Sequence, residues 1–136
     1  MRYWINFASS FIALNQLDTA RDYAERAAEL GKKLSNLEGT SLAWMNLGFI
    51  EGHRGNWTES DDFFDQAFKG IIRLNSKRQH VAMEEKRIKL YLEKEEIGKA
   101  KTSLDNLVDL CNENRSEANL AILDQAIKNY NSYEIK

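Results

Sequence analysis

The chain has 136 residues, of which 43% are hydrophobic and 29% are charged, and its formal net charge is -2. This composition favours one ordered domain over a disordered chain, and the near-neutral charge argues against recruitment of nucleic acid or an acidic membrane. The absence of proline and the 7 glycines suit long helices. One cysteine, no apolar run of membrane-spanning length and no signal-peptide pattern at the start predict a cytoplasmic protein without a membrane segment.

Apolar residues along the chain repeat with a period of forty, beginning with Trp4 and Trp44. Six positions of the first repeat find counterparts in the second and third at the same offset. Self-similarity at this period predicts helical hairpins that stack on one another. The matched positions are Phe7, Ala8, Leu17, Ala20, Ala24 and Ala27, then Leu47, Gly48, Trp57, Ser60, Phe64 and Ala67, then Arg87, Ile88, Ile97, Ala100, Leu104 and Leu107.

Polar residues between the apolar stripes predict where the helices begin. We expect Asp18, Thr58 and Gly98 to be N-caps, and Ser35 with Glu38 to form a capping box. A second capping box is expected at Ser76 and Gln79. The expected helices cover about 2–14, 19–34, 36–54, 59–74, 77–94, 99–113 and 117–131. They form one domain, 1–136, with repeats at about 1–34, 41–74 and 81–114 and a capping helix at about 116–133.

The second repeat resembles the tetratricopeptide repeat, whose pattern is Trp, Leu-Gly, Tyr, Ala, Phe and Ala. The residues that carry the resemblance are Trp44-Met45-Asn46-Leu47-Gly48, Gly55-Asn56-Trp57, Ser60, Phe64 and Ala67. The first repeat matches well and the third weakly, and the forty-residue period is similar to the longer-helix branch of that family. The resemblance implies an all-α, right-handed superhelical solenoid of three hairpins plus a C-terminal capping helix, with a concave groove that binds a partner.

The resemblance implies that the first helix of each hairpin forms the groove, and a helical wheel puts Ile5, Ser9 and Ile12 on the concave side of the first of these helices. The predicted groove is apolar over the first two repeats, with Met45 and Phe49 at its centre, and charged over the third. Such a surface suits an amphipathic helix or a peptide with a few apolar anchors; alternatively, Met45 and Phe49 pack against a neighbouring loop. The predicted groove residues are Ile5, Ser9, Ile12, Leu42, Met45, Asn46, Phe49, His53, Lys86 and Lys89.

The best-known chemistry of the family is a clamp of basic and amide side chains around a peptide carboxylate. Only Asn46 and Lys86 match that clamp, and a carboxylate needs several convergent donors, so clamp binding is not expected. The basic residues of the third repeat are interleaved with glutamates, which is typical of a solvated helix face and argues against nucleic-acid binding.

An enzymatic alternative rests on Asp61, Asp62 and Asp65, which resemble the magnesium-binding aspartates of helical terpenoid synthases. The repeat register argues against it, because acids in the first turn of a helix interact favourably with the helix dipole. The two histidines, with Cys111, lack metal-ligand spacing. We therefore expect no metal, no cofactor and no enzymatic activity.

The first helix is apolar over most of its circumference. Its stripes leave mainly polar residues such as Asn6 and Ser10 for water, whereas solenoids normally end in a polar capping face. This predicts that upstream repeats or a second copy covers the helix; alternatively, the aromatic rings fill the hairpin interior. The stripes are Tyr3, Trp4, Phe7, Phe11 and Leu14, and then Ile5 and Ile12.

The function expected overall is a protein–protein interaction module, which acts as an adaptor, scaffold or regulatory sensor segment.

Overall fold

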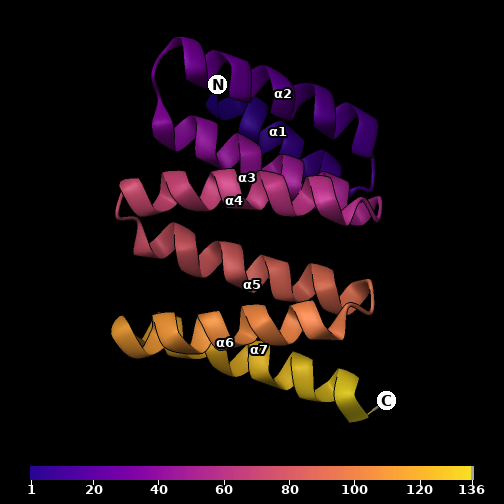
Figure 1. Cartoon of the computed structure of the whole chain (residues 1–136), viewed down its shortest axis with the longest axis vertical. Helices are drawn as coiled ribbons and strands as arrows, with labels where there is room; N and C mark the ends of the chain where they lie inside the picture. Colours follow the sequence, from indigo (N-terminus) through magenta and orange to yellow (C-terminus); the bar gives the residue numbers. More distant parts are fainter. Residues whose placement is uncertain (136) are drawn as a thin grey trace. The chain divides into compact units, whose positions relative to one another are not determined.

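The protein is all-α, without a strand in residues 1–135, which the computed structural model describes (Figure 1). This confirms the predicted fold class at the level of helix content. The packing of consecutive helices within each part of the chain is compatible with a helical repeat. The helices are α1 (Arg2–Ala13), α2 (Leu17–Lys33), α3 (Leu37–His53), α4 (Trp57–Arg73), α5 (Lys77–Glu93), α6 (Ile97–Glu113) and α7 (Glu117–Ile135).

The chain divides into two compact units, Met1–Ser76 and Lys77–Lys136. The first unit holds α1 to α4, and the second holds α5 to α7. The sequence predicted a single domain over 1–136, of which Lys136 lies outside the described residues.

A three-residue turn, repeated every twenty residues, ends each of the helices α1 to α5. In the first turn Asn15 has a φ of 59°, its N–H donates to the carbonyl of Ile12, and the N–H of Gln16 donates to the carbonyl of Phe11. These are the two backbone bonds of a Schellman motif, which satisfy carbonyls at the end of a helix. The later turns, centred on Ser35, Gly55, Asn75 and Glu95, repeat both bonds and the positive φ.

The predicted starts of the second helices were two residues too late. Helices α2, α4 and α6 begin at Leu17, Trp57 and Ile97, so Asp18, Thr58 and Gly98 lie inside the first turn and are not N-caps. The N-cap residues, Gln16, Asn56 and Glu96, make no capping bond through their side chains. Backbone geometry of the preceding turn therefore sets these starts.

The predicted capping box at Ser35 is also wrong. Ser35 has a φ of 51° and belongs to the turn, and the N-cap of α3 is Asn36. The Asn36 side chain accepts a hydrogen bond from the Gly39 N–H at 2.8 Å. An asparagine in this place satisfies one of the free donors at the start of the helix.

Burial is compatible with the forty-residue register at several matched positions, although Phe7 is exposed where its counterpart Leu47 is buried. Ala20 and Ser60 are fully buried in the first unit, and their counterpart Ala100 is fully buried in the second. The Ser60 hydroxyl donates to the carbonyl of Gly48 at 2.7 Å, so this polar member of the set is satisfied inside the core.

Small residues let α3 lie close to both of its sequence neighbours. A methyl group on Gly31 of α2 would overlap the hydroxyl of Thr40, and one on Gly70 of α4 would overlap that of Ser41. A methyl group on Gly48 would meet the Phe64 ring at 2.8 Å. Helix α3 contacts α1, α2 and α4, as the first unit shows in Figure 1, and is therefore its central helix.

In the second unit α5 and α6 form a hairpin, and α7 packs against both. Among residues 117–133 of α7, Ala126 and Tyr130 are buried, while Leu120 is exposed. The predicted capping helix, at about 116–133, corresponds to α7. Its apolar stripe covers the α5–α6 hairpin, and its outer face is largely polar.

The repeated turn predicts opposite effects for two glycine substitutions. Gly55 has a φ of 80° and Gly98 lies near the start of α6, and a methyl group on either would meet nothing within 4 Å. Gly55→Ala should lower the free energy of unfolding by about 1 kcal/mol, because the left-handed conformation disfavours a β-carbon. Gly98→Ala should raise it by about 0.5 kcal/mol through helix propensity. Urea unfolding of both variants tests this, and shifts of the same sign would contradict it.

Candidate functional site

The residues predicted at the centre of the groove, Met45 and Phe49, are buried. Their side chains are 5% and 7% exposed, and the Phe49 ring lies edge-on to Phe64 at a centroid distance of 4.9 Å. The expectation that they form an open apolar surface is therefore wrong. The helical wheel gave α3 one packed face, whereas α3 contacts three other helices of its own unit.

Asn46 joins α3 to α1 and is largely occupied by that contact. Its amide nitrogen donates to the carbonyl of Ile5 at 3.2 Å, and its amide oxygen accepts from the Ser9 hydroxyl at 3.3 Å. Asn46 is buried, so these bonds replace bonds to water. The three residues form a polar contact between helices of the first unit.

The other predicted groove residues keep some exposure. Ile12, Leu42 and His53 are half-buried in the first unit, and Lys86 and Lys89 are exposed in the second. These residues belong to two different units. The role of the residues in partner binding stays a prediction.

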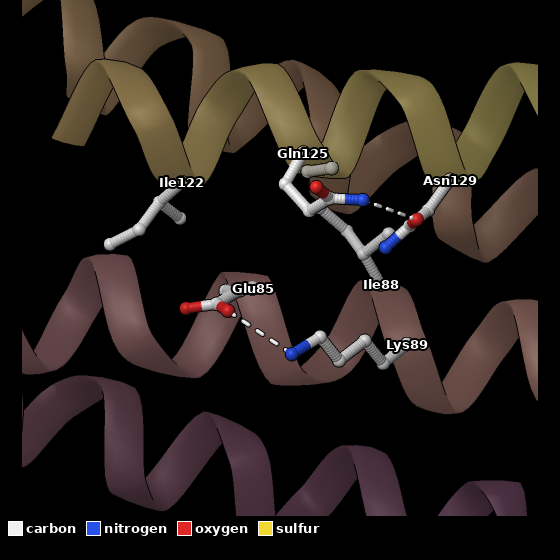
Figure 2. Close-up of a pocket in the computed structure, with 7 residues that line it drawn as sticks. Glu85, Ile88, Lys89, Ile122, Gln125 and Asn129 are labelled. Atoms are coloured by element: carbon white, nitrogen blue, oxygen red, sulfur yellow. Dashed lines mark hydrogen bonds and ion pairs between the residues drawn. The ribbon is translucent and has the colours of Figure 1, made fainter. Parts of the chain in front are cut away.

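A small cavity lies between α5 and α7 of the second unit (Figure 2). Glu85 and Lys89 of α5 form an ion pair of 3.2 Å at its edge, and Gln125 donates to Asn129 of α7 at 2.9 Å. Its volume is about 10 Å³, which is the size of a single water molecule. The cavity is therefore a packing defect rather than a ligand site.

A larger depression of about 300 Å³ lies beside the turn between α2 and α3. Lys32 and Arg73 give it positive charge, and the Lys32 ammonium lies 5.6 Å from the centre of the Trp44 ring. Asn36 lines it and already satisfies one of the free donors at the start of α3. No buried polar atom without a partner points to a ligand here among the described residues.

A buried carboxylate, Glu51, connects α3 to α2. It forms an ion pair with Arg21 and accepts a hydrogen bond from the Asn56 amide at 2.8 Å. The hydrogen bond to Glu25 raises the pKa of the Arg21 guanidinium above its ordinary value, as does the charge of Glu51, while burial opposes the rise. The guanidinium thus stays charged and neutralises a carboxylate that is 2% exposed.

The second unit holds a comparable buried carboxylate, Glu84. One oxygen accepts from Arg87 at 3.1 Å, and the Arg87 Nε also donates to the Tyr91 hydroxyl at 3.1 Å. His80 lies one turn before Glu84, and its pKa is lowered chiefly because burial disfavours the charged imidazolium. The charges of Lys77 and Arg87 add to that effect, while Glu84 and Glu113 oppose it.

The candidates for metal binding and catalysis do not come together. Asp62 and Asp65 are exposed on α4, and no group of three or more His, Cys, Asp or Glu side chains in residues 1–135 is placed to hold a metal. Burial raises the pKa of the Cys111 thiol, whose sulfur lies 3.5 Å from the carbonyl oxygen of Asn119. A protonated, buried thiol packs as a small apolar group.

Exposed large apolar residues gather on one side of α1. Tyr3 is 75% exposed, Phe7 47% and Leu14, which directly follows the helix, 65%. Ser10, between Phe7 and Leu14, is exposed as well. These four residues, termed here the α1 seam, lie on one side of the helix because their spacing is four, three and four residues.

The α1 seam corresponds to a covered surface on α3. The residues forty positions after Tyr3, Phe7 and Ser10 are Ala43, Leu47 and Ile50, and all three are buried. Helix α2 covers this side of α3: Ala43 packs with Ala27 and Ala28, and Leu47 and Ile50 pack with Ala20 and Ala24 of α2 and also with Ala8 of α1. Within residues 1–76, α1 contacts α2 and α3, and Phe7 meets Tyr23 of α2, but Tyr3 and Leu14 on this side stay exposed.

No protein-family model matches this sequence, and neither a curated protein nor a solved structure does. The resemblance to the tetratricopeptide repeat therefore stays a prediction. None of the helices in residues 1–135 combines the length and apolar character needed to cross a membrane.

The ion pair of Glu51 predicts unequal effects for two variants around Arg21. Arg21→Met leaves a buried carboxylate without its cation and should lower the free energy of unfolding by about 2 kcal/mol. Glu25→Gln removes only the exposed partner of Arg21 and should change it by no more than about 0.5 kcal/mol. Urea unfolding measures both values, and equal losses would show that Glu51 does not depend on Arg21.

The lowered pKa of His80 predicts a pH-dependent stability. The unfolded chain binds a proton near the ordinary value of 6.5, while the folded protein binds it only at lower pH. Stability should therefore fall as the pH drops below 6.5, and His80→Gln should reduce that fall. Urea unfolding at about pH 7.5 and 5.5 measures the change, with His53→Gln as control. An identical fall in the wild type and His80→Gln would exclude this role.

Proposed function

We propose that this protein is a non-enzymatic protein–protein interaction module, an adaptor, scaffold or regulatory sensor segment, that binds an α-helix of a partner protein. The proposal includes a tetratricopeptide-like architecture, in which the hairpins form a right-handed solenoid that α7 caps. The forty-residue register of buried positions and the turns at twenty-residue intervals support it.

The open α1 seam is the observation that carries the proposal. The equivalent surface of α3 binds a helix, α2, through alanines at helical spacing. The seam residues stand forty positions before the residues of that α3 surface. A second helix should therefore fit along α1 in the same manner. Exposed aromatic residues gathered on one helix face are also typical of binding surfaces.

The chemistry of the seam indicates an apolar partner helix. Glu51 of α3 pairs with Arg21 of α2, and Arg54, which directly follows α3, pairs with Asp18 of α2. The positions forty residues earlier are Phe11 and Leu14, which offer no charge to a partner. Affinity must therefore come from apolar burial and ring packing rather than from ion pairs.

Photo-cross-linking from the seam tests the proposal. A benzophenone side chain in place of Tyr3 should form an adduct with a partner protein in the native host, whereas one in place of Phe68 on α4 should not. The adduct should fall about tenfold when Leu14→Glu is added, since a charge in the seam costs more than about 1.4 kcal/mol of binding.

Leu34→Glu is the matched control, because Leu34 occupies the same place in the next turn and is similarly exposed, at 61%. It should leave the Tyr3 adduct intact. Equal labelling from Tyr3 and Phe68, or an adduct that survives Leu14→Glu, would remove the seam as the binding surface.

A further inference from the structure

We infer that the helix bound by the α1 seam is α1 of a second copy of this chain, antiparallel to the first about a twofold axis. The inference rests on the proposed function and names the partner. It starts from the geometry of the four seam residues, which fall within an arc of about 60° at 100° per residue. Alternating spacings of three and four residues are those of a seam between two helices.

The seam is complementary to itself in the antiparallel orientation. Pairing about the midpoint between residues 8 and 9 places Phe7 against Ser10 of the other copy, and Tyr3 against Leu14. A large ring then faces a small hydroxymethyl group, which is the size matching that close helix packing needs. Parallel pairing would set Phe7 against Phe7 and leave a gap at Ser10.

Charge also favours the antiparallel pair. Arg2 is the only charged residue of α1. In the antiparallel pair it lies beside the C-terminal end of the other α1, where a cation interacts favourably with the helix dipole. In a parallel pair the two Arg2 side chains would lie close together and repel.

The seam continues an interface that already exists within the first unit. The Phe7 ring meets Tyr23 of α2 edge-on at 5.5 Å, and the same Tyr23 stacks on Phe11 at 5.7 Å. Phe7 is therefore held in place before association, so it loses little side-chain entropy on binding. A second α1 would extend this aromatic layer across the twofold axis.

The size of the seam predicts a weak dimer. Stable complexes bury about 800 Å² per partner, and a helix of 12 residues supplies only part of that area. Dissociation constants of about 10 to 100 µM are consistent with such an interface. The dimer should therefore form within a range of concentration that sedimentation can follow.

Sedimentation velocity of the full chain between roughly 5 and 500 µM tests the dimer. The wild type should shift from monomer to dimer, and Tyr3→Glu and Leu14→Glu should each remain monomeric. Both substitutions are at highly exposed positions, and circular dichroism confirms that the variants are folded. Leu34→Glu should dimerise like the wild type.

Disulfide trapping tests the orientation. In a Cys111→Ala background, a mixture of Tyr3→Cys and Leu14→Cys proteins should form a cross-linked heterodimer at least about tenfold faster than either protein alone, because only the antiparallel pair brings these positions together. A Tyr3→Cys homodimer that forms as fast as the heterodimer would overturn the antiparallel arrangement.

A wild type that stays monomeric at the highest concentration would overturn the second copy as occupant. The photo-cross-linking test then separates the two proposals. An adduct between Tyr3 and a different protein would leave the proposed function standing, and no adduct at all would remove both.

Discussion

The turn that recurs every twenty residues is the constraint on which the rest of the structure depends. Each turn reverses a helix end through two backbone hydrogen bonds and one residue with positive φ, and four of these five residues are not glycine. Because the bonds involve only the backbone, the turn tolerates Asn15, Ser35 and Glu95 alike at a modest conformational cost. A fixed turn and a fixed helix length then bring the same sequence positions together in each repeat.

In the first unit this constraint places α3 among three other helices. The amino-acid composition of α3 follows from that position. A helix packed on several sides needs small residues where the backbones approach, and Gly48 supplies one against Phe64. It also buries polar groups, which need partners inside the protein. Glu51 is therefore tied to the pair with Arg21, thirty residues earlier, and the contact fixes how α2 lies on α3.

The sequence predicted the features that repeat and failed where local and tertiary effects compete. The forty-residue register was recognisable because buried positions such as Ala20, Ser60 and Ala100 recur at one spacing. The helix starts were misplaced because Asp18 and Thr58 resemble N-caps, whereas the turn before them is set by the backbone. The burial of Met45 and Phe49 was missed because a helical wheel shows which side of a helix is apolar but not how many neighbours it has. A signal was present: α3 has apolar or small residues on every side.

The comparison of α1 with α3 connects the repeat to the proposed function. Equivalent positions on the two helices differ in size and surroundings, since Ala43 lies beneath α2 while Tyr3 is open to water. If Tyr3 and Leu14 only filled space within the hairpin, they would point toward α2, as Phe7 does by meeting Tyr23 and as Trp4 does by packing on the alanine-rich core. Instead the most exposed aromatic residue, Tyr3, and the exposed Leu14 lie on the side of α1 whose counterpart on α3 is covered by α2. Exposed apolar area of this kind contributes favourable free energy only when a second surface removes it from water. The side of α1 that this unit leaves uncovered is thus the side that association would cover.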